Sequence, residues 1–388
     1  MTGTTIYLDH NATTPARAEV AEAVAATLAC VGNPSSVHGP GRRARRMVEA
    51  ARRDVADLVG AEAREVVFTS GGTEANNMAL LEPGARRLFI SAVEHPSVRS
   101  AAAHSGLHVR ILPVGPDGCL DMAGCAVQFE ELGEGDVVSV MLANNETGVI
   151  QPVAEVAALV HARGARIHCD AVQAAGKIAV DFAALGVDYL SVSAHKIAGP
   201  MGVGALIVRD GVPVGPRIVG GGQESGRRSG TENLPGIVGF GTAARLARAN
   251  LETFARLAEW RDAMESRLIQ AVPGLRVFGQ GAPRLANTSC LAMPGVAAET
   301  QVIAFDLDGF AVSAGSACSS SKVQASPVLE AMGVDAETAG QAIRVSLGWT
   351  TRAKDVEDFA TCWLALYDRL ARTPPADTDL AVQQTMVR

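Results

Sequence analysis

The sequence of 388 residues lacks the features that mark several special classes of protein. It contains no uninterrupted apolar run long enough to cross a membrane. Its opening residues, MTGTTIYLDHNATTP, include neither the basic nor the apolar segment of a secretory signal peptide. It also lacks an excess of positive charge, because the formal net charge is −7, which argues against nucleic acid or anionic membranes as the main partner. We therefore expect a cytoplasmic protein without a membrane or nucleic acid partner.

Cysteine is present in seven copies, but no C-x-x-C pair exists and the spacings are irregular. This pattern argues against a disulfide framework and against a structural zinc site, so most of the cysteines are expected to be small buried side chains. Cys318 differs, because it lies in SAGSACSSSK (residues 313–322), where eight of ten residues are Ser, Ala or Gly. Such a composition favours a mobile loop, in which Cys318 is either an incidental thiol or the carrier of chemistry.

Short β-rich runs alternate with helical patterns between residues 64 and 210. The runs REVVFTS, RLFISA, HVRILPV, DVVSVML, ARIHCD and VDYLSVS are typical of strands, and the alternation predicts an α/β fold with a mostly parallel sheet between helices. From about Asn250 the pattern changes to a long amphipathic helix over residues 250–272 and mixed elements after it, which predicts a smaller α+β domain. We place the large domain at residues 14–250. The small domain then comprises residues 1–13 and 251–388, with the cysteine loop at about 313–322.

Polar residues follow several of the predicted strands, at the edge where open α/β sheets bind ligands. Each one alone has an ordinary interpretation, as a helix cap, a core histidine or a surface lysine. Together they supply an amine, a carboxylate, an imidazole and a helix N-terminus suited to a phosphate, which are the groups that pyridoxal phosphate needs. The residues are Thr73, His95, Asn144, Asn145, Asp170, Gln173, Ser193, His195 and Lys196.

A series of longer motifs resembles the Nif/Isc-type cysteine desulfurases. The motifs run in order from about Tyr7 to Leu347 and are YLDHNATTP, FTSGGTEANN, VEHPSV, NNETG, HCDAVQAAGK, SAHKIAGPMGVGAL, GGGQESGRRSGTEN and SAGSACSSS. Those enzymes belong to the class V aminotransferase group of fold-type I pyridoxal phosphate enzymes. The resemblance implies a seven-stranded type of sheet in the large domain, pyridoxal 5'-phosphate as cofactor and L-cysteine as substrate. It also implies a homodimer with shared active sites and a sulfur-acceptor protein, either an iron–sulfur scaffold or a relay protein, as a partner.

The resemblance assigns a role to individual residues. Lys196 is the lysine that bonds to the cofactor, Asp170 is the partner of the pyridinium nitrogen, and His95 stacks on the ring and is available for proton transfer. Arg344 binds the substrate carboxylate, although an ordinary inter-domain salt bridge is the alternative. The remaining cofactor contacts fall on Gly72, Thr73, Ser193 and His195 around the phosphate, Gln173 at the phenolic oxygen, Asn145 beside the ring and the substrate, and Thr231 at the phosphate of the neighbouring subunit.

On this interpretation the chain converts L-cysteine to L-alanine, and Cys318 takes up the sulfur as a persulfide. The resemblance also allows Cys318 to ligate an iron–sulfur cluster transiently. A selenocysteine lyase, a plain class V aminotransferase and a catalytically silent sulfur-relay protein are the alternatives. The pathway stays open between nitrogenase maturation, housekeeping cluster assembly and tRNA thiolation, because the tail after Arg372 does not resemble the scaffold-binding segment of the family.

Overall fold

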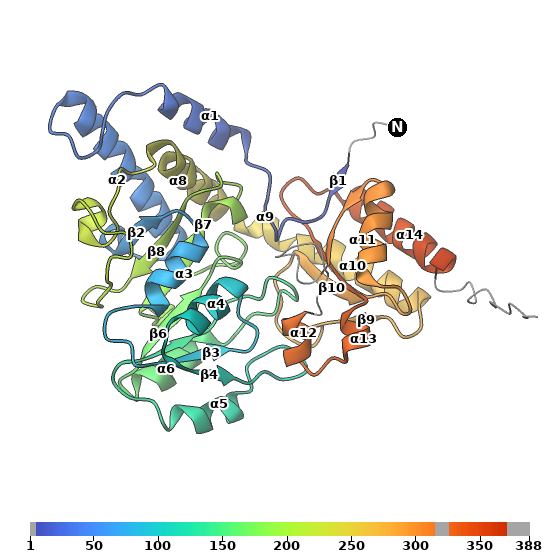
Figure 1. The fold of residues 1–388 in the computed structure, drawn as a ribbon. Coiled ribbons are helices and arrows are strands. Elements are labelled where there is room, and N and C mark those ends of the chain that lie inside the picture. Colours follow the sequence, from blue (N-terminus) through green and yellow to red (C-terminus); the bar gives the residue numbers. More distant parts are fainter. Residues whose placement is uncertain (1–4, 315–325, 371–388) are drawn as a thin grey trace, which may run out of the picture.

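The computed structural model describes residues 5–314 and 326–370, and places them in two unequal parts (Figure 1). The larger part is built on a seven-stranded sheet with the order β2-β8-β7-β6-β5-β3-β4. Only β8 runs antiparallel to its neighbours. The strands are β2 (Val66–Thr69), β3 (Arg87–Ser91), β4 (His108–Leu112), β5 (Asp136–Ser139), β6 (Arg166–Asp170), β7 (Tyr189–Ser193) and β8 (Gly204–Val208).

Helices cover both faces of this sheet, because successive strand residues point to opposite sides. Phe68 in β2 packs in the cluster that contains Val55 and Phe240, whereas its neighbour Val67 packs with Met78. The helices are α1 (Ala18–Leu28), α2 (Gly39–Val59), α3 (Gly72–Leu80), α4 (Pro96–His104), α5 (Met122–Phe129), α6 (Val153–His161), α7 (Phe182–Leu185) and α8 (Leu234–Ala249). Short 3-10 helices are η1 (Ala63–Glu65), η2 (Ala194–Lys196) and η3 (Gln223–Gly226).

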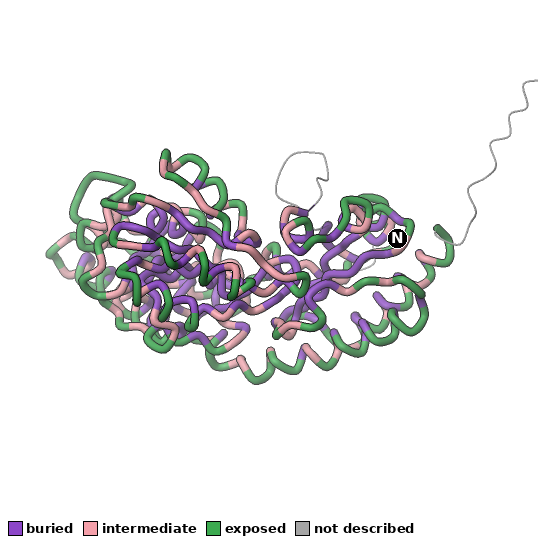
Figure 2. The backbone as a smooth tube through the Cα atoms, turned by 90° about the horizontal axis from the view of Figure 1, so that it is seen from below, coloured by how far each residue is buried: buried purple, intermediate pink, exposed green. Residues whose placement is uncertain are grey.

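The smaller part has a core of its own, which Figure 2 shows as a second group of buried segments. Its four-stranded antiparallel sheet has the order β12-β13-β10-β9, and Met264, Phe305 and Trp363 contribute helix side chains to the core. The strands are β9 (Arg276–Val277), β10 (Thr288–Ala292), β12 (Ser313–Ala314) and β13 (Ala342–Ser346). The helices are α9 (Leu251–Ala255), α10 (Leu257–Ala271), α11 (Ala298–Leu307), α12 (Pro327–Ala331), α13 (Ala336–Ala339) and α14 (Ala353–Leu370).

The N-terminal segment connects the two parts. Its strand β1 (Ile6–Tyr7) pairs in parallel with β11 (Phe310–Ala311), and Asp9 bridges to Ser346 in the small part. A few residues later Thr14 N donates to the carbonyl of His195 in the large part (3.1 Å). Residues 9–14 therefore run along the edge of the large sheet where β7 ends.

The predicted fold class is confirmed, and all six predicted strands are present. The sequence argument missed β8, and it was wrong in one helix: residues 250–272 form α9 and α10, which are separated at Arg256, instead of one continuous helix. The domain boundaries stay a prediction. Among the residues that the structure describes, no helix is long and apolar enough to span a bilayer.

Candidate active site

A cavity of about 570 Å³ lies at the carboxyl ends of the central strands, between the two parts of the chain. Ten residues to which the motifs assign a role line it. They are Gly72, Thr73, His95, Asn145, Asp170, Gln173, Ser193, His195, Lys196 and Arg344. The carboxyl ends of β6 and β7 and the segments that follow β2, β3, β5, β6 and β7 supply nine of them, and β13 of the small part supplies Arg344. The topology thus gathers residues that are up to 272 positions apart in the sequence.

One end of the cavity is formed by the N-terminus of α3. The first N–H groups of a helix have no partner within the helix, and the helix dipole favours an anion beside them. Gly72 allows close packing at this point, because a Cβ on it would lie 2.8 Å from Val172 Cγ2. The imidazole of His195 is neutral at physiological pH, since burial and the charge of Lys196 lower its pKa to about 4. Thr73, Ser193 and His195 therefore offer hydrogen bonds without a further charge.

Two buried acids lie deeper in the cavity, and they have different surroundings. Asp170 accepts hydrogen bonds from Asn76 Nδ2 (2.8 Å) and from Val172 N (3.0 Å). Glu94 accepts one from Met141 N (2.6 Å), and its second oxygen has no partner among the described residues. Burial and the nearby charge of Asp170 raise the pKa of Glu94 well above its ordinary value. Burial therefore disfavours a negative charge on Glu94, whereas Asp170 is held by two hydrogen-bond donors.

His95 is held by the first turn of α4. Its Nδ1 accepts from Ser97 N (3.1 Å) and lies 2.7 Å from Ser97 Oγ, so the neutral ring carries its proton on Nε2. Burial lowers the pKa of His95, the charge of Asp170 opposes this shift, and Lys196 and Arg344 add to it. The neutral form of the ring is thus favoured, and it borders the cavity with its Nε2–H as a hydrogen-bond donor.

Lys196 ends η2 and is tied to the N-terminal segment. Its Nζ donates to the backbone carbonyl of Asn11 and to that of Ala12 (2.8 Å). The side chain of Asn11 continues the connection into the small part, because Asn11 Nδ2 donates to Thr288 Oγ1 (2.9 Å). The segment between the two parts therefore sets the position of the Lys196 amine.

Arg344 forms an ion pair and also lines the cavity, although its partner belongs to the predicted small domain, so the pair is not the inter-domain one given as the alternative. Its Nη2 forms a buried ion pair with Asp9 Oδ1 (2.7 Å), and its Nη1 donates to the carbonyl of Asn145 (3.1 Å). It also lines the cavity, and its Nε has no partner among the described residues. Arg344 thus presents a positive charge to the cavity while Asp9 fixes its orientation.

Two predicted site residues are not in this group. Thr231 is exposed and does not line the cavity. Cys318 lies outside the described residues. Pro327 and Val328, which line the cavity, lie nine and ten positions after it in the sequence.

A family comparison identifies this arrangement. The family model Aminotransferase class-V matches residues 6–359. The chain belongs to the class-V aminotransferase family. It is 42% identical over 381 residues to a cysteine desulfurase from Cereibacter sphaeroides, which covers 95% of this chain and 97% of the relative. An IscS-like cysteine desulfurase from Mycobacterium tuberculosis is 40% identical over 366 residues, or 90% of this chain and 93% of the relative.

The solved structures agree with this membership. The structure of a NifS-like protein from Rickettsia africae superposes with a TM-score of 0.87 and 34% identity, covering 94% of this chain and 99% of that protein. The resemblance to cysteine desulfurases and the fold type inferred from the motifs are thereby confirmed. The roles of the individual site residues stay predictions.

Class-V aminotransferases are pyridoxal phosphate enzymes, and the cavity of this family member fits that cofactor. Asp170 is a buried carboxylate held by two donors, and Lys196 brings an amine to the same cavity. Gly72 leaves the N-terminus of α3 closely packed on the loop after β6, where a larger side chain would displace Val172. A buried carboxylate, a lysine amine and a helix N-terminus, which are the groups that this cofactor needs, thus border one cavity.

Sequence reasoning missed four residues that shape the site, namely Asn11, Asn76, Glu94 and Glu146. Each occurs inside one of the quoted motifs. One signal could have identified these four residues: each is a polar residue within a motif whose other polar residues line the cavity. Glu146 is buried, lines the cavity and accepts a hydrogen bond from Ser326 Oγ (2.5 Å), which caps α12.

Glu146 gives this enzyme a pH-dependent stability. Burial raises its pKa from 4.5 to about 7, against the opposing effects of Ser326, Arg344 and Arg99. Between these two values the folded chain holds a proton that the unfolded chain has released. The contribution of Glu146 to the free energy of unfolding therefore falls as pH rises from about 4.5 to 7, by about 3 kcal/mol in total. Glu146→Gln keeps an acceptor for Ser326 but does not titrate.

The variant should therefore lose this part of the pH dependence. Thermal unfolding midpoints at pH 5 and pH 8 test the prediction, and the midpoint at pH 5 minus the midpoint at pH 8 should have a lower value in Glu146→Gln than in the wild type. Glu330→Gln, at an exposed position of α12, is the matched control. Equal differences in the wild type and in Glu146→Gln would show that Glu146 is already ionised at pH 5.

Proposed function

We propose that this chain is a pyridoxal phosphate-dependent cysteine desulfurase, which converts L-cysteine to L-alanine and holds the sulfur as a persulfide on Cys318. One observation carries the proposal: ten residues assigned by the motifs of cysteine desulfurases line a single cavity in a member of this family. The curated relatives at 42% and 40% identity carry the name cysteine desulfurase and support the same reaction.

The chain's own residues have separable tasks in this reaction. Pyridoxal phosphate, when bound, supplies an electron sink for the bonds at the substrate α-carbon. Arg344 binds the substrate carboxylate, the Lys196 amine moves the proton of the α-carbon, and His95 Nε2 exchanges a proton with the substrate. The thiolate of Cys318 forms a bond to the substrate sulfur as the carbon–sulfur bond breaks. The sulfur is oxidised, the carbon is reduced and takes up a proton, and L-alanine leaves.

Turnover by the purified chain tests the proposal. L-cysteine should give alanine in amounts equal to the sulfur recovered with a thiol reductant. Turnover of selenocysteine but not of cysteine would instead indicate a selenocysteine lyase. Amino transfer to a keto acid without release of sulfur would indicate a plain aminotransferase.

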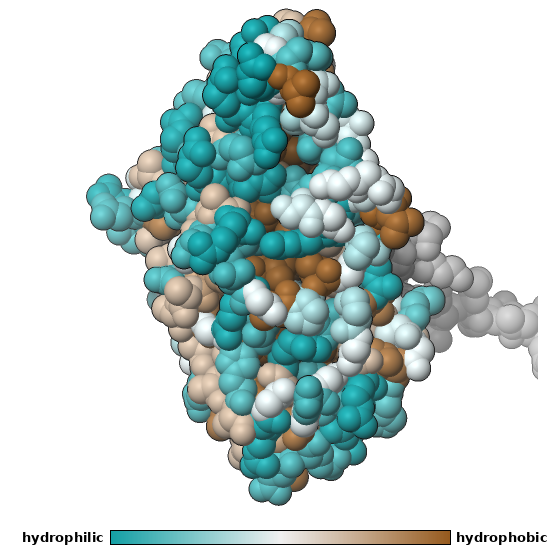
Figure 3. Space-filling view, turned by 90° about the vertical axis from the view of Figure 1, so that its left-hand side faces the viewer, coloured by the Kyte–Doolittle hydropathy of each residue, from teal (hydrophilic) through white to brown (hydrophobic). Residues whose placement is uncertain are grey.

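The proposal includes a homodimer with shared active sites. Thr231 supports it, because this residue is exposed and does not line the cavity of its own chain, so it is free to serve a neighbouring one. Apolar side chains also remain exposed on the described surface, among them Val31, Val37 and Val219. Figure 3 shows a hydrophobic patch within an otherwise mostly hydrophilic face. A fully active monomer in sedimentation velocity would contradict the shared site.

The remaining elements of the proposal concern the cell. We place the enzyme in the cytoplasm and expect it to pass sulfur to an acceptor protein, either an iron–sulfur scaffold or a relay protein. Affinity capture from a lysate after treatment with L-cysteine tests this. Transfer of labelled sulfur to small thiols alone, with no labelled protein, would count against an acceptor protein.

A further inference from the structure

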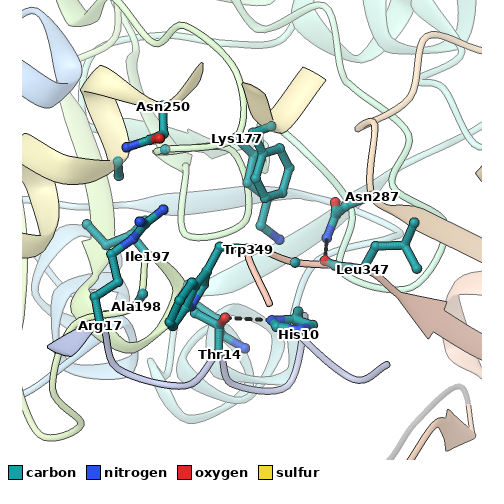
Figure 4. A pocket seen from close by; sticks show the side chains of 15 residues that line it. His10, Thr14, Arg17, Lys177, Ile197, Ala198, Asn250, Asn287, Leu347 and Trp349 are labelled. Atoms are coloured by element: carbon teal, nitrogen blue, oxygen red, sulfur yellow. Dashed lines mark hydrogen bonds between the residues drawn. The ribbon is translucent and has the colours of Figure 1, made fainter. Parts of the chain in front are cut away.

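A second, much smaller cavity lies behind Lys196, on the other side of the N-terminal segment. It has a volume of about 40 Å³, and His10, Thr14, Arg17 and Trp349 contribute to its lining (Figure 4). In Figure 4 the side chain of Lys177 extends toward the middle of this space. Lys177 is buried, and the chain has only four lysines beside 30 arginines, of which Lys177 and Lys196 line this small cavity.

The amine of Lys177 is bound by neutral acceptors. Its Nζ donates to Gln173 Oε1 and to Asn11 Oδ1, at 2.7 Å each. Asn287 Nδ2 donates to the same oxygen of Asn11 (3.0 Å). In the part of the chain that the structure describes, Lys177 forms no ion pair with a carboxylate. A buried lysine without an acidic partner is costly in its charged form, so its retention here needs a reason.

The two bonds of Lys177 determine which way the Gln173 side chain faces. With Oε1 bound to Lys177, the amide nitrogen of Gln173 is directed to the other side, where Nε2 donates to the carbonyl of Asn11 (2.9 Å). A flipped amide would place its oxygen against that carbonyl and its NH2 group against the amine, so the hydrogen bond to the carbonyl would be lost and the Lys177 N–H would lose its acceptor. The second N–H of Gln173 is the group that remains for a ligand in the large cavity, which Gln173 also lines.

The backbone before Lys177 is adapted to this position. Gly176 has a φ of +73°, which is unfavourable for residues with a Cβ. A Cβ there would also lie 2.8 Å from Ile197 Cγ2 and 2.9 Å from Ala247 Cβ. The turn therefore fits closely between the residue after Lys196 and α8, and it directs Lys177 into the interior.

The charges around Lys177 favour its neutral form. Burial lowers its pKa well below the ordinary value, and the charges of Lys196 on η2 and Arg344 on β13 lower it further. His10, which follows β1, adds no charge at physiological pH because burial lowers its pKa to about 4. A neutral amine has two N–H groups, which match its two acceptors, so it keeps both hydrogen bonds without adding a second positive charge beside Lys196.

We propose that Lys177 is a positioning residue of the reaction: it fixes the Gln173 amide so that an N–H group faces the phenolic oxygen of the cofactor, and it joins Gln173 to Asn11, which also binds Lys196. This inference rests on the proposed function, because the partner of Gln173 is the bound cofactor. Lys177 itself does not line the large cavity and so acts through its neighbours.

A double-mutant cycle on the purified holoenzyme tests the proposal. Lys177→Met keeps the length of the side chain and removes both donors, and Gln173→Leu removes the amide. The readout is the midpoint of the pH titration of the visible absorbance band of the bound cofactor. Loss of a donor to the phenolic oxygen makes the cofactor hold its proton more tightly, so each single variant should raise the midpoint by about half a pH unit or more.

The double variant should shift the midpoint no further than Gln173→Leu alone, since Lys177 acts through that amide. Lys354→Met, on the exposed face of α14, should leave it unchanged. If Lys177→Met yields no folded protein, Lys177→Gln, which retains a donor, takes its place in the same cycle. Additive shifts, or a wild-type midpoint in the Lys177 variant, would overturn the inference. A wild-type chain that binds no cofactor would instead overturn the proposed function.

Discussion

Replacement of Cys318 by serine should reduce the formation of alanine from L-cysteine at least about 100-fold and should abolish the persulfide. The reason is chemical, since serine has nearly the same size but its hydroxyl stays protonated near neutral pH. Lys196, Asp170 and the N-terminus of α3 are unchanged in this variant, so cofactor binding should persist. The visible absorbance of the bound cofactor reports on that second expectation independently of turnover.

The other cysteines of the described chain are poor substitutes. Cys125, Cys169 and Cys290 are buried, and burial raises the pKa of all three, that of Cys125 to about 12. Burial likewise raises the pKa of Cys362 to about 11. Cys30 is exposed, but it does not line the cavity. Cys30→Ser is therefore the matched control, and it should turn over L-cysteine at the wild-type rate.

Mass spectrometry of peptides after treatment with L-cysteine gives the direct measurement. In the wild type, one additional sulfur should appear on the peptide that contains Cys318. An additional sulfur on any other cysteine, or undiminished release of alanine by Cys318→Ser, would assign the nucleophile elsewhere.

Replacement of Lys196 by alanine should lower turnover at least about 1,000-fold, because the variant loses both the attachment of the cofactor and the base for the α-carbon proton. Borohydride reduction followed by peptide mapping locates the attachment in the wild type. The chain has four lysines, so the mapping has few possible outcomes. The label should be on Lys196 and absent from the variant.

Lys177 and Lys354 provide the two comparisons for this experiment. Among the described residues Lys177 is a second lysine near the site, but its amine is held by Gln173 and Asn11 and is buried. Lys354 lies on the exposed face of α14 in an ion pair with Asp358 (2.9 Å), and Lys354→Ala should keep full turnover. Label on Lys177 would refute the assignment of Lys196.

The strands of the large sheet were predictable because they are buried on both faces and therefore appear as continuous apolar runs. The break between α9 and α10 at Arg256 was not predictable, since the apolar stripe through Phe254 and Leu257 is compatible with one unbroken helix. Strand β8 was missed because only the short 3-10 helix η2 and a loop separate it from β7, without the α-helix that alternates with the other strands.

The residues of the site likewise divide into those that the sequence predicted and those that it did not. Asp170 ends β6 and Lys196 lies three positions after β7, so their common location was expected from parallel topology. Asn11 and Glu146 owe their roles to partners more than 100 positions away, such as Lys177 for the former and Ser326 for the latter. No local pattern encodes such a pair, and only the packing of the small part against the large one brings its members together.

The path of the N-terminal segment has a consequence for synthesis of the chain on the ribosome. Asn11 is translated early, yet its N–H binds Ser346 Oγ (2.9 Å), and β1 pairs with β11. At bacterial and eukaryotic elongation rates, residues 310–346 emerge about 15 s to 1 min after Asn11. The strands of the large sheet can pair before that time. The N-terminal segment that binds Lys196 cannot complete its contacts by then, because its partners β11 and Ser346 have not yet emerged. A nascent chain stalled before β13 should thus contain a folded sheet with an unfinished catalytic centre, and its first residues should be open to proteases and to chaperones until translation is nearly complete.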